Sequence, residues 1–407
     1  MTVSEKALVR STSRRTAVSV VFGTAGFGLA SWLVRLPLVQ SDLHASTLQM
    51  GILAFGISAG SVVGFTQASR AVARFGPARV IWVASALAAL GLSIGGIGAS
   101  SVVSIPLTFA GVLLYGAGNG TCNVAMNIEG AAVEREYRRP IMPWFHACFS
   151  VGAIVGALAG AAGAFLAVPL SLHLGIVSLL MVLLISVCVR SLVATDSPGR
   201  PEKKPDVAAA RVEPAPGRRR MRWPRALDAR TVRVGVVVLG MSFANGAAND
   251  WIAIAMVNSR GVSQGFAALT LNLFTVAIVV ARVCGVPVLR RVGRVRAVQG
   301  SAVLALAGIL MFIAGPTPPW AIAGAVLWGA GVALGFPIGM SAAGDDPEEA
   351  PSRISLVASL GYAGTLVGPP LIGFVAEGVG IRASLLIVLG LVLVAGLSAP
   401  VLRERRS

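Results

Sequence analysis

The sequence predicts an all-α, polytopic membrane protein with twelve transmembrane helices, arranged as two pseudo-symmetric six-helix bundles. Three observations predict this fold: an apolar composition, apolar stretches of membrane-spanning length, and a repeat that relates the two halves of the chain. Of the 407 residues, 55% are hydrophobic and only 13% are charged, whereas a soluble domain carries about 25% charged residues. The chain lacks the polar surface that water requires, so we expect it in a lipid bilayer.

Twelve stretches are long enough to cross the hydrocarbon core, which takes about 20 apolar residues in a helix. A backbone in lipid must satisfy its own hydrogen bonds, which favours helices for all of them. The first follows a basic segment, but its length and lack of a small-residue cleavage site argue against a secretory signal peptide. The expected spans are 16–38, 47–68, 79–99, 104–126, 142–165, 171–192, 232–256, 264–286, 296–314, 320–340, 354–375 and 381–401.

A basic, proline-rich segment divides these spans into two sets of six. It covers residues 193–231 and contains the run Arg218-Arg219-Arg220-Met221-Arg222. Its composition is that of a poorly ordered linker. We therefore expect a first bundle over residues 1–192, a cytoplasmic linker over 193–231, and a second bundle over 232–407.

The net charge of +17 would suggest a nucleic-acid partner in a soluble protein. Here the basic residues lie between apolar spans, so we interpret them as topology signals and expect no nucleic acid. If the N-terminus is cytoplasmic, about 30 of the 34 Lys and Arg residues lie on the cytoplasmic side, as the positive-inside rule requires. Both termini are then cytoplasmic. The arginine-rich loops are expected to contact anionic lipid headgroups and the acidic residues at 345–349.

Three short patterns recur in the same order in both halves. The pattern Arg-apolar-Gly-x-x-Arg occurs at 74–79 and again at 291–296. Ala30-Ser31-Trp32 corresponds to Asn249-Asp250-Trp251, and Gly-x-x-x-Gly occurs at 152–156 and at 364–368. The offsets of 217, 219 and 212 residues indicate a duplication. Parallel six-helix repeats of this kind are typical of one large group of transporters.

With these patterns the chain resembles the major facilitator superfamily over essentially its whole length. The elements at 74–79 and 291–296 are similar to the signature Gly-x-x-x-Asp-Arg-x-Gly-Arg-Arg between helices 2 and 3. The acidic position of that signature is Ala73 in the first half and Arg290 in the second, so the charge relay of that Asp is not implied here. The resemblance implies the major facilitator fold and a secondary transporter of a small solute.

Further motifs resemble the fucose-permease-like branch, and they are more similar to its bacterial inner-membrane members of unassigned substrate than to the sugar permeases proper. In helix 7, similar proteins often carry a Glu where this chain has Asn245. If that Glu couples protons in relatives, the role is missing here or has moved to Asp250. The motifs that carry the resemblance are 32–37 (WLVRLP), 123–130 (NVAMNIEG), 139–143 (RPIMP) with His146, 249–251 (NDW) and 361–370 (GYAGTLVGPP).

Two charged residues inside the spans are the first site candidates, because a charge near the bilayer centre costs about 2.5–3.5 kcal/mol. Arg35 lies toward the outer end of helix 1 and is expected to anchor an anionic group or to form an outer gate; the alternative is an interfacial arginine beside Trp32. Asp250 lies at similar depth in helix 7. It is expected to act as a proton-coupling carboxylate, to contact the substrate, or to pair with Arg35. The alternative for Asp250 is an interfacial aspartate. Arg282 in helix 8 is interpreted as snorkelling to the cytoplasmic headgroups, and the alternative is a substrate or gate role.

Other polar side chains complete the predicted site. Asn119, Asn123 and Asn127 recur every four residues, which places them on one face of helix 4, toward the cavity or a neighbouring helix. His146 can exchange protons near neutral pH and is expected, with Glu129, at a cytoplasmic gate or else in a packing role. The predicted substrate-binding set is Arg35, Trp32, Asn119, Asn123, Asn245, Asn249, Asp250 and Trp251, and the predicted coupling or gating set is Asp250, His146 and Glu129.

The sequence argues against an enzyme and against a bound metal or other cofactor. The three histidines are dispersed, and Cys122, Cys148, Cys188 and Cys284 lie in apolar spans without ligand spacing, so we interpret them as small packing residues. No Walker loop is present to drive ATP-dependent pumping. We expect a monomer that moves a small solute by alternating access across the inner membrane, with protons as the coupling ion. An exporter working as a proton antiporter and a non-transporting sensor or scaffold are the alternatives.

Overall fold

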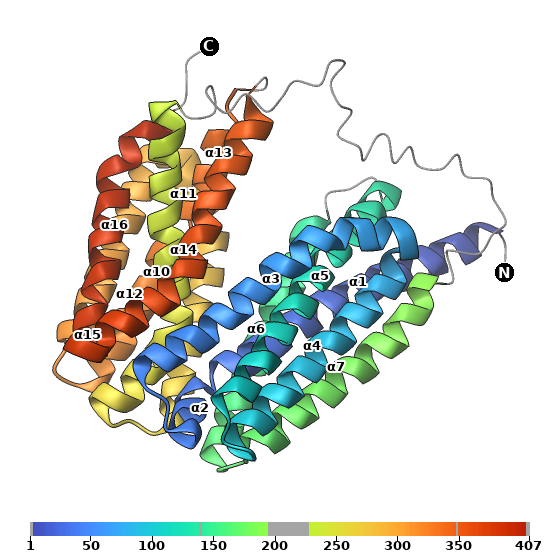
Figure 1. Ribbon diagram of the computed structural model, residues 1–407. Coiled ribbons are helices and arrows are strands. Elements are labelled where there is room, and N and C mark those ends of the chain that lie inside the picture. The colour runs from blue at the N-terminus through green and yellow to red at the C-terminus, as the bar shows by residue number, and fades with distance from the viewer. Residues whose placement is uncertain (1–2, 138–140, 194–227, 347–348, 404–407) are drawn as a thin grey trace.

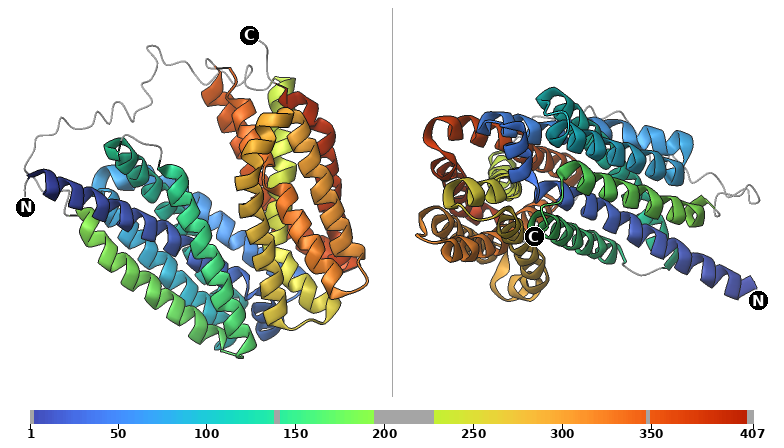
Figure 2. Two further views of the ribbon diagram at one scale, coloured as in Figure 1. Left: turned by 180° about the vertical axis from the view of Figure 1, so that it is seen from behind. Right: turned by 90° about the horizontal axis from the view of Figure 1, so that it is seen from below.

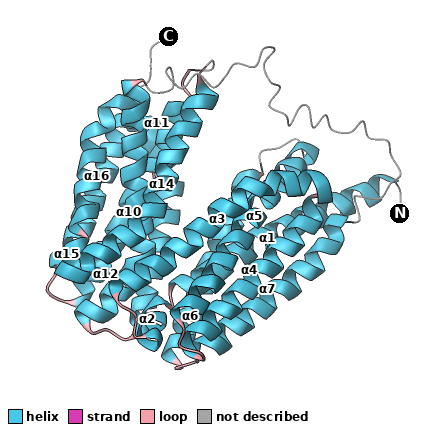
Figure 3. Ribbon diagram, viewed as in Figure 1, coloured by secondary structure: helices cyan, strands magenta, loops and turns pink. Residues whose placement is uncertain are grey.

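The computed structural model describes residues 3–137, 141–193, 228–346 and 349–403, and within these ranges every regular element is a helix (Figure 3). The central part of the predicted linker, residues 194–227, lies outside the described residues, as do the arginine run 218–222 and Glu348. The helices of the first half are α1 (Val3–Leu33), α2 (Leu36–Leu43), α3 (Thr47–Phe75), α4 (Pro77–Ser100), α5 (Ile105–Tyr137), α6 (Met142–Phe165) and α7 (Leu170–Val193). Those of the second half are α10 (Ala229–Arg260), α11 (Gln264–Ala314), α12 (Pro318–Val332), α13 (Gly335–Ala343), α14 (Ala350–Val379), α15 (Ile381–Ser384) and α16 (Leu386–Ser398).

Eleven spans in the described residues are long and apolar enough to cross a membrane. The twelfth predicted span, 104–126, is also helical and forms the first part of the 33-residue helix α5. This helix is not among the eleven because its asparagines and glycines lower its mean hydropathy. The helix with the weakest hydropathy is thus the one that carries the predicted asparagine stripe.

The duplicated loop motif has the same backbone conformation in both halves. Gly76 joins α3 to α4 with φ 80° and ψ 154°. Gly293 interrupts the long helix α11 with φ 76° and ψ 168°. It lies in the second of the two membrane-spanning parts of this helix, Gln264–Gly285 and Pro287–Ala314. Residues with a side chain rarely adopt this region, so both repeats need glycine at this position.

The Gly-x-x-x-Gly pairs allow equivalent helices to approach closely in each half. A Cβ at Gly152 of α6 would lie 1.9 Å from the carbonyl oxygen of Gly23 on α1, and one at Gly364 of α14 would lie 3.0 Å from that of Leu239 on α10. Small residues at these contacts are what holds helices together in lipid. The pairs α1–α6 and α10–α14 therefore occupy corresponding places in the two halves.

The two bundles converge at one end of the molecule and diverge toward the other (Figures 1 and 2). We call the end that carries α2 and α15 the closed end, and the opposite end, where α10 begins and α5 finishes, the open end. The bundles touch through α3 with α14, α6 with α11, and α2 with α10. At the closed end Gly51 faces Pro369, and Thr47 Oγ1 donates a 2.6 Å hydrogen bond to Glu377 Oε2.

Candidate functional site: a cavity between the bundles

A cavity of about 690 Å³ lies between the two bundles toward the open end. This size falls within the range of small-molecule sites, about 300–1,000 Å³. We call it the central cavity. One wall comes from α6 of the first bundle, and the remainder comes from α11, α13 and the break between α12 and α13. Its lining residues are His146, Arg282, Gly285, Leu289, Arg294, Leu334, Phe336, Pro337, Ile338 and Ser341.

Arg282 is held in this cavity by a break in the tenth predicted span. The sequence predicts one helix over 320–340, but α12 ends at Val332 and α13 begins at Gly335. Pro337 lacks the amide that would bind the carbonyl oxygen of Ala333 four residues earlier. Arg282 Nε donates to that oxygen at 3.4 Å. The break therefore supplies an acceptor for Arg282 beside the cavity, which the snorkelling interpretation did not foresee.

His146 reaches the same cavity from the first bundle. Its side chain is exposed, and its ring meets that of Phe22 edge-on at 5.3 Å between centroids. The expected contact with Glu129 is not formed, because Arg14 Nε donates to Glu129 Oε1 at 2.6 Å and Arg14 also binds Glu136. The buried Glu129 thus belongs to an ion pair between α1 and α5, apart from His146.

Aromatic rings extend the apolar wall of the central cavity. Phe336 of α13 lies 6.5 Å from Tyr362 of α14, and Tyr362 lies 6.2 Å from Phe65 of α3, between ring centroids. Phe65 and Tyr362 are exposed although they lie in membrane-spanning helices. The Phe65–Tyr362 contact joins the two bundles. These rings were not among the predicted site residues, since aromatic residues in apolar spans give no signal of their own.

The predicted residues of α10 lie nearer the closed end. Asn245, Asn249 and Asp250 are half-buried, and Trp251 is buried with no hydrogen-bond partner for its indole nitrogen in the described residues. No hydrogen bond or ion pair involves Asp250 within the described ranges. Asp250 lies ten residues before the end of α10, or about 15 Å along the helix axis. These residues are not in the lining of the central cavity.

The asparagines of α5 are half-buried, and two of them contact each other. Asn127 Nδ2 donates to the backbone carbonyl of Asn123 at 2.7 Å and to its side-chain oxygen at 3.3 Å. Asn119 lies two turns earlier on the same face. Part of the hydrogen-bonding capacity of the stripe is therefore satisfied within α5 itself.

Arg35 occupies a different pocket, of about 820 Å³, at the closed end. It lies in the short break between α1 and α2, just before Pro37 in the first turn of α2, and it is only 1% exposed. Its guanidinium donates to the carbonyl oxygens of Gly160 and Val168 in and after α6. Arg35 thus fastens the α1–α2 break to the end of α6 and has no contact with Asp250. Trp32, one turn earlier, is buried against Gly95 of α4.

The closed-end pocket also contains Asp42 and His44. Burial lowers the pKa of Arg35, and this is opposed by the negative charge of Asp42. Burial likewise raises the pKa of Asp42 above its ordinary value, opposed by the positive charges of Arg35 and His44. The desolvation of each group outweighs their mutual attraction, so this pair is a weak one.

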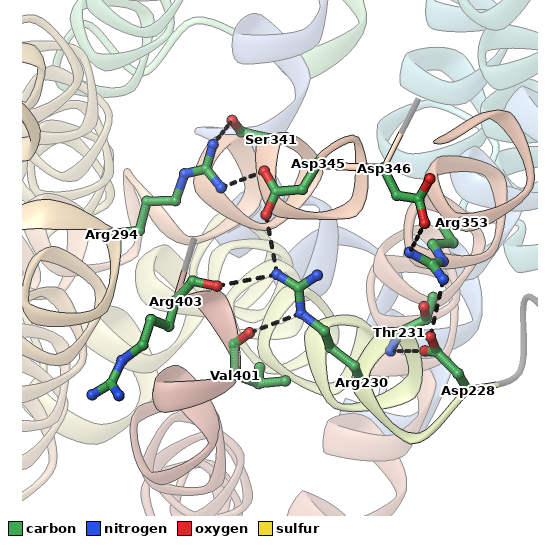
Figure 4. Close-up of polar contacts among 10 residues, drawn as sticks. All are labelled: Asp228, Arg230, Thr231, Arg294, Ser341, Asp345, Asp346, Arg353, Val401 and Arg403. Carbon is green, nitrogen blue, oxygen red and sulfur yellow. Dashed lines mark hydrogen bonds and ion pairs between the residues drawn. The ribbon is translucent and has the colours of Figure 1, made fainter. Parts of the chain in front are cut away.

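A network of ion pairs ties together the open end of the second bundle (Figure 4). Asp345 accepts hydrogen bonds from Arg230 at 3.0 Å and from Arg294 at 2.6 Å. Arg353 binds Asp228 and Asp346, each at 3.1 Å. The predicted contacts of the acidic residues at 345–346 with arginines are present, and they join helices of the same bundle.

The family profile of the Major Facilitator Superfamily matches residues 17–346 and 234–407. The chain belongs to this superfamily. It is therefore a multi-pass membrane transporter of the secondary type and not an enzyme. An uncharacterized transporter of the superfamily from Yersinia pestis is 28% identical over 378 residues, which cover 92% of each chain.

Solved structures of the superfamily share the fold. The nucleoside transporter NupG superimposes with a TM-score of 0.72 at 15% identity, covering 97% of this chain and all of that one. The fucose:proton symporter FucP of E. coli gives a TM-score of 0.58 at 15% identity, covering 96% of this chain and 98% of that one. At this identity the similarity shows the fold, which is the predicted one.

Proposed function

We propose that this chain moves a small polar solute across the bacterial inner membrane by alternating access, and binds it in the central cavity. The observation that carries the proposal is the arrangement of the two bundles. They touch at the closed end, while a cavity lined by both of them lies toward the open end. Rocking of one bundle against the other would expose such a site to each side of the membrane in turn.

The charge distribution supports a cytoplasmic open end. Arginines at the closed end are occupied by backbone carbonyls: Arg35 binds Gly160 and Val168, and Arg260 binds Gly315 and Phe312. Most other basic residues of the described chain lie in the helix ends at the open end, the side on which the positive-inside rule places the cytoplasm. The structure is then inward-facing, its termini are cytoplasmic, and its loops meet anionic lipid headgroups. One chain contains both bundles, so a monomer suffices.

Asp250 is the proposed proton-coupling group. It is a half-buried carboxylate in a membrane-spanning helix, without a partner among the described residues. A carboxylate in such surroundings exchanges its proton when its environment changes. His146, at the cavity wall, is a second candidate. The similar fold of a fucose:proton symporter agrees with coupling by a symport mechanism, whereas an exporter would run the same cycle as an antiporter.

The test begins with a thermal-stability screen of the purified full chain against a metabolite library at two pH values. A solute that stabilises the protein is then followed into proteoliposomes under an imposed pH gradient. We expect Asp250→Asn to lose gradient-driven accumulation and to retain solute exchange, while Glu349→Gln, at the open end, behaves like the wild type. Accumulation that ignores the gradient would remove the proton proposal. Binding without any flux would replace transport by the sensor alternative.

A further inference from the structure

Arg282 is a cation without a counter-ion in the central cavity. Its Nε bond to the carbonyl of Ala333 is the contact that it makes in the described residues, and no ion pair involves it there. The other arginine of the lining, Arg294, is bound to Asp345 at 2.6 Å and to Ser341 at 3.1 Å (Figure 4). Among the described residues that line the cavity, none is acidic. The cavity therefore presents one uncompensated guanidinium, with the imidazole of His146 in the same lining.

Arg282 lies near the end of the membrane span Gln264–Gly285, eleven residues before the break at Gly293, or about 17 Å along the helix axis. Its Nε donates to the carbonyl oxygen of Ala333, next to Leu334 of the cavity lining. Charged residues at such depth usually pair with an opposite charge or mark the path of a substrate. Since no carboxylate of the described residues pairs with Arg282, we look to a ligand for the opposite charge.

The shape and lining of the cavity indicate what kind of anion fits. The two terminal nitrogens of Arg282 match the two oxygens of a carboxylate, which is the pairing that guanidinium groups form best. Part of the lining is apolar, with Leu289, Leu334 and Phe336, and the ring of Phe336 in turn meets that of Tyr362. A free inorganic anion would gain nothing from this wall, whereas an organic acid would bury its body against it.

We propose that the solute is a small organic carboxylate, with its carboxylate on Arg282 and His146 and its apolar or ring portion against Phe336. This rests on the proposed function, because it assigns a substrate class to the same cavity. It also moves the anion contact from Arg35, which is occupied at the closed end, to the second bundle. When the solute is released toward the open end, water hydrates Arg282. The ion pair between Arg282 and the solute therefore need not persist through the transport cycle.

The experiment compares matched probes on the full chain in detergent at pH 7. The pairs are benzoate with benzamide and glucuronate with glucose, and inorganic phosphate is a separate arm. We expect one or both carboxylates to raise the melting temperature saturably and their neutral counterparts and phosphate to have no effect. In Arg282→Gln the apparent affinity should fall at least tenfold. Arg282→Lys should recover part of it, and Arg290→Gln, an exposed position on the same helix outside the lining, should bind like the wild type.

Several results would overturn the assignment: equal stabilisation by the neutral counterparts, stabilisation by phosphate alone, no response to either carboxylate, or unchanged binding in Arg282→Gln. If that variant does not purify as a monodisperse protein, His146→Gln and Arg282→Lys provide the same comparison. Flux separates the two proposals. A neutral probe that binds and is transported contradicts the carboxylate class and leaves alternating access in place. A carboxylate that binds through Arg282 but does not move contradicts transport and leaves the anion site in place.

Discussion

Replacing Gly51 by alanine should push the conformational equilibrium away from the state with a sealed closed end. A Cβ at Gly51 would lie 2.7 Å from the carbonyl oxygen of Pro369 and 3.0 Å from the Cα of Pro370, across the interface of the two bundles. Both contacts are with backbone, so the bundles must separate locally by several tenths of an ångström. Overpacking of this kind costs about 1–3 kcal/mol. The cost applies only to the conformation in which the bundles touch at the closed end. The population in which they are separated there should therefore rise about 5- to 150-fold relative to the population in which they touch.

Spin labels at Leu166 and Val379 would report this change as a longer distance between the bundles at the closed end. Both positions are exposed, one after α6 and the other at the end of α14. Gly378→Ala is the matched control, because a Cβ there has nothing within 4 Å. The reasoning is refuted if Gly51→Ala keeps the distance distribution of the wild type while it unfolds at a lower temperature. That result would mean that Gly51 serves the stability of the fold and not the choice between conformations.

Three further predictions concern stability. Arg14→Ala should destabilise the protein by about 3–5 kcal/mol, because it leaves the buried carboxylate of Glu129 unpaired. Adding Glu129→Gln should restore much of the lost stability, as measured by thermal unfolding. If stability does not recover, Arg14 acts through packing. Asp42→Asn should be more stable than the wild type at pH 7, since burial raises the pKa of Asp42 and ionisation of this carboxyl therefore opposes folding. The gain in stability should vanish by about pH 3, where the carboxyl is protonated in both the folded and the unfolded state. A gain that is independent of pH would contradict this cause. Gly293→Ala should cost about 1–3 kcal/mol for its φ of 76°, whereas Gly300→Ala, in open space within a helix, should be neutral or stabilising.

The fold could be predicted from the sequence because the bilayer imposes local rules. Span length, basic loops and the glycine of each repeated loop are properties of short segments, and Gly76 and Gly293 show that the repeat in sequence is a repeat in backbone conformation. The break between α12 and α13 was missed since a Gly- and Pro-containing apolar stretch reads as one span. Its only local signal was Pro337, whose missing amide marks a carbonyl that needs another donor.

The site could be predicted only in part, because depth along a helix says nothing about what the side chain faces. Arg35 and Arg282 both lie within or beside apolar spans, yet Arg35 binds the carbonyls of a neighbouring loop and Arg282 faces the cavity. Likewise Glu129 and His146 were paired on polarity, whereas Arg14, 115 residues from Glu129, is its partner. Such choices are made by the rotation of each helix in its bundle, which the spacing of a single sequence does not determine.

The placement of the polar contacts explains how a protein with such densely packed bundles can still change conformation. The network of Arg230, Arg294 and Asp345 lies inside the second bundle and resists internal deformation (Figure 4). Within the described residues, the polar contacts between bundles at the closed end are exposed, such as those of Thr47 with Glu377 and of Gln40 with Asn258. Each contributes little net stability, because water replaces it when it breaks. Rocking thus exchanges weak interface contacts for hydration while each bundle keeps its own strong ones, which is the condition for two states of similar free energy.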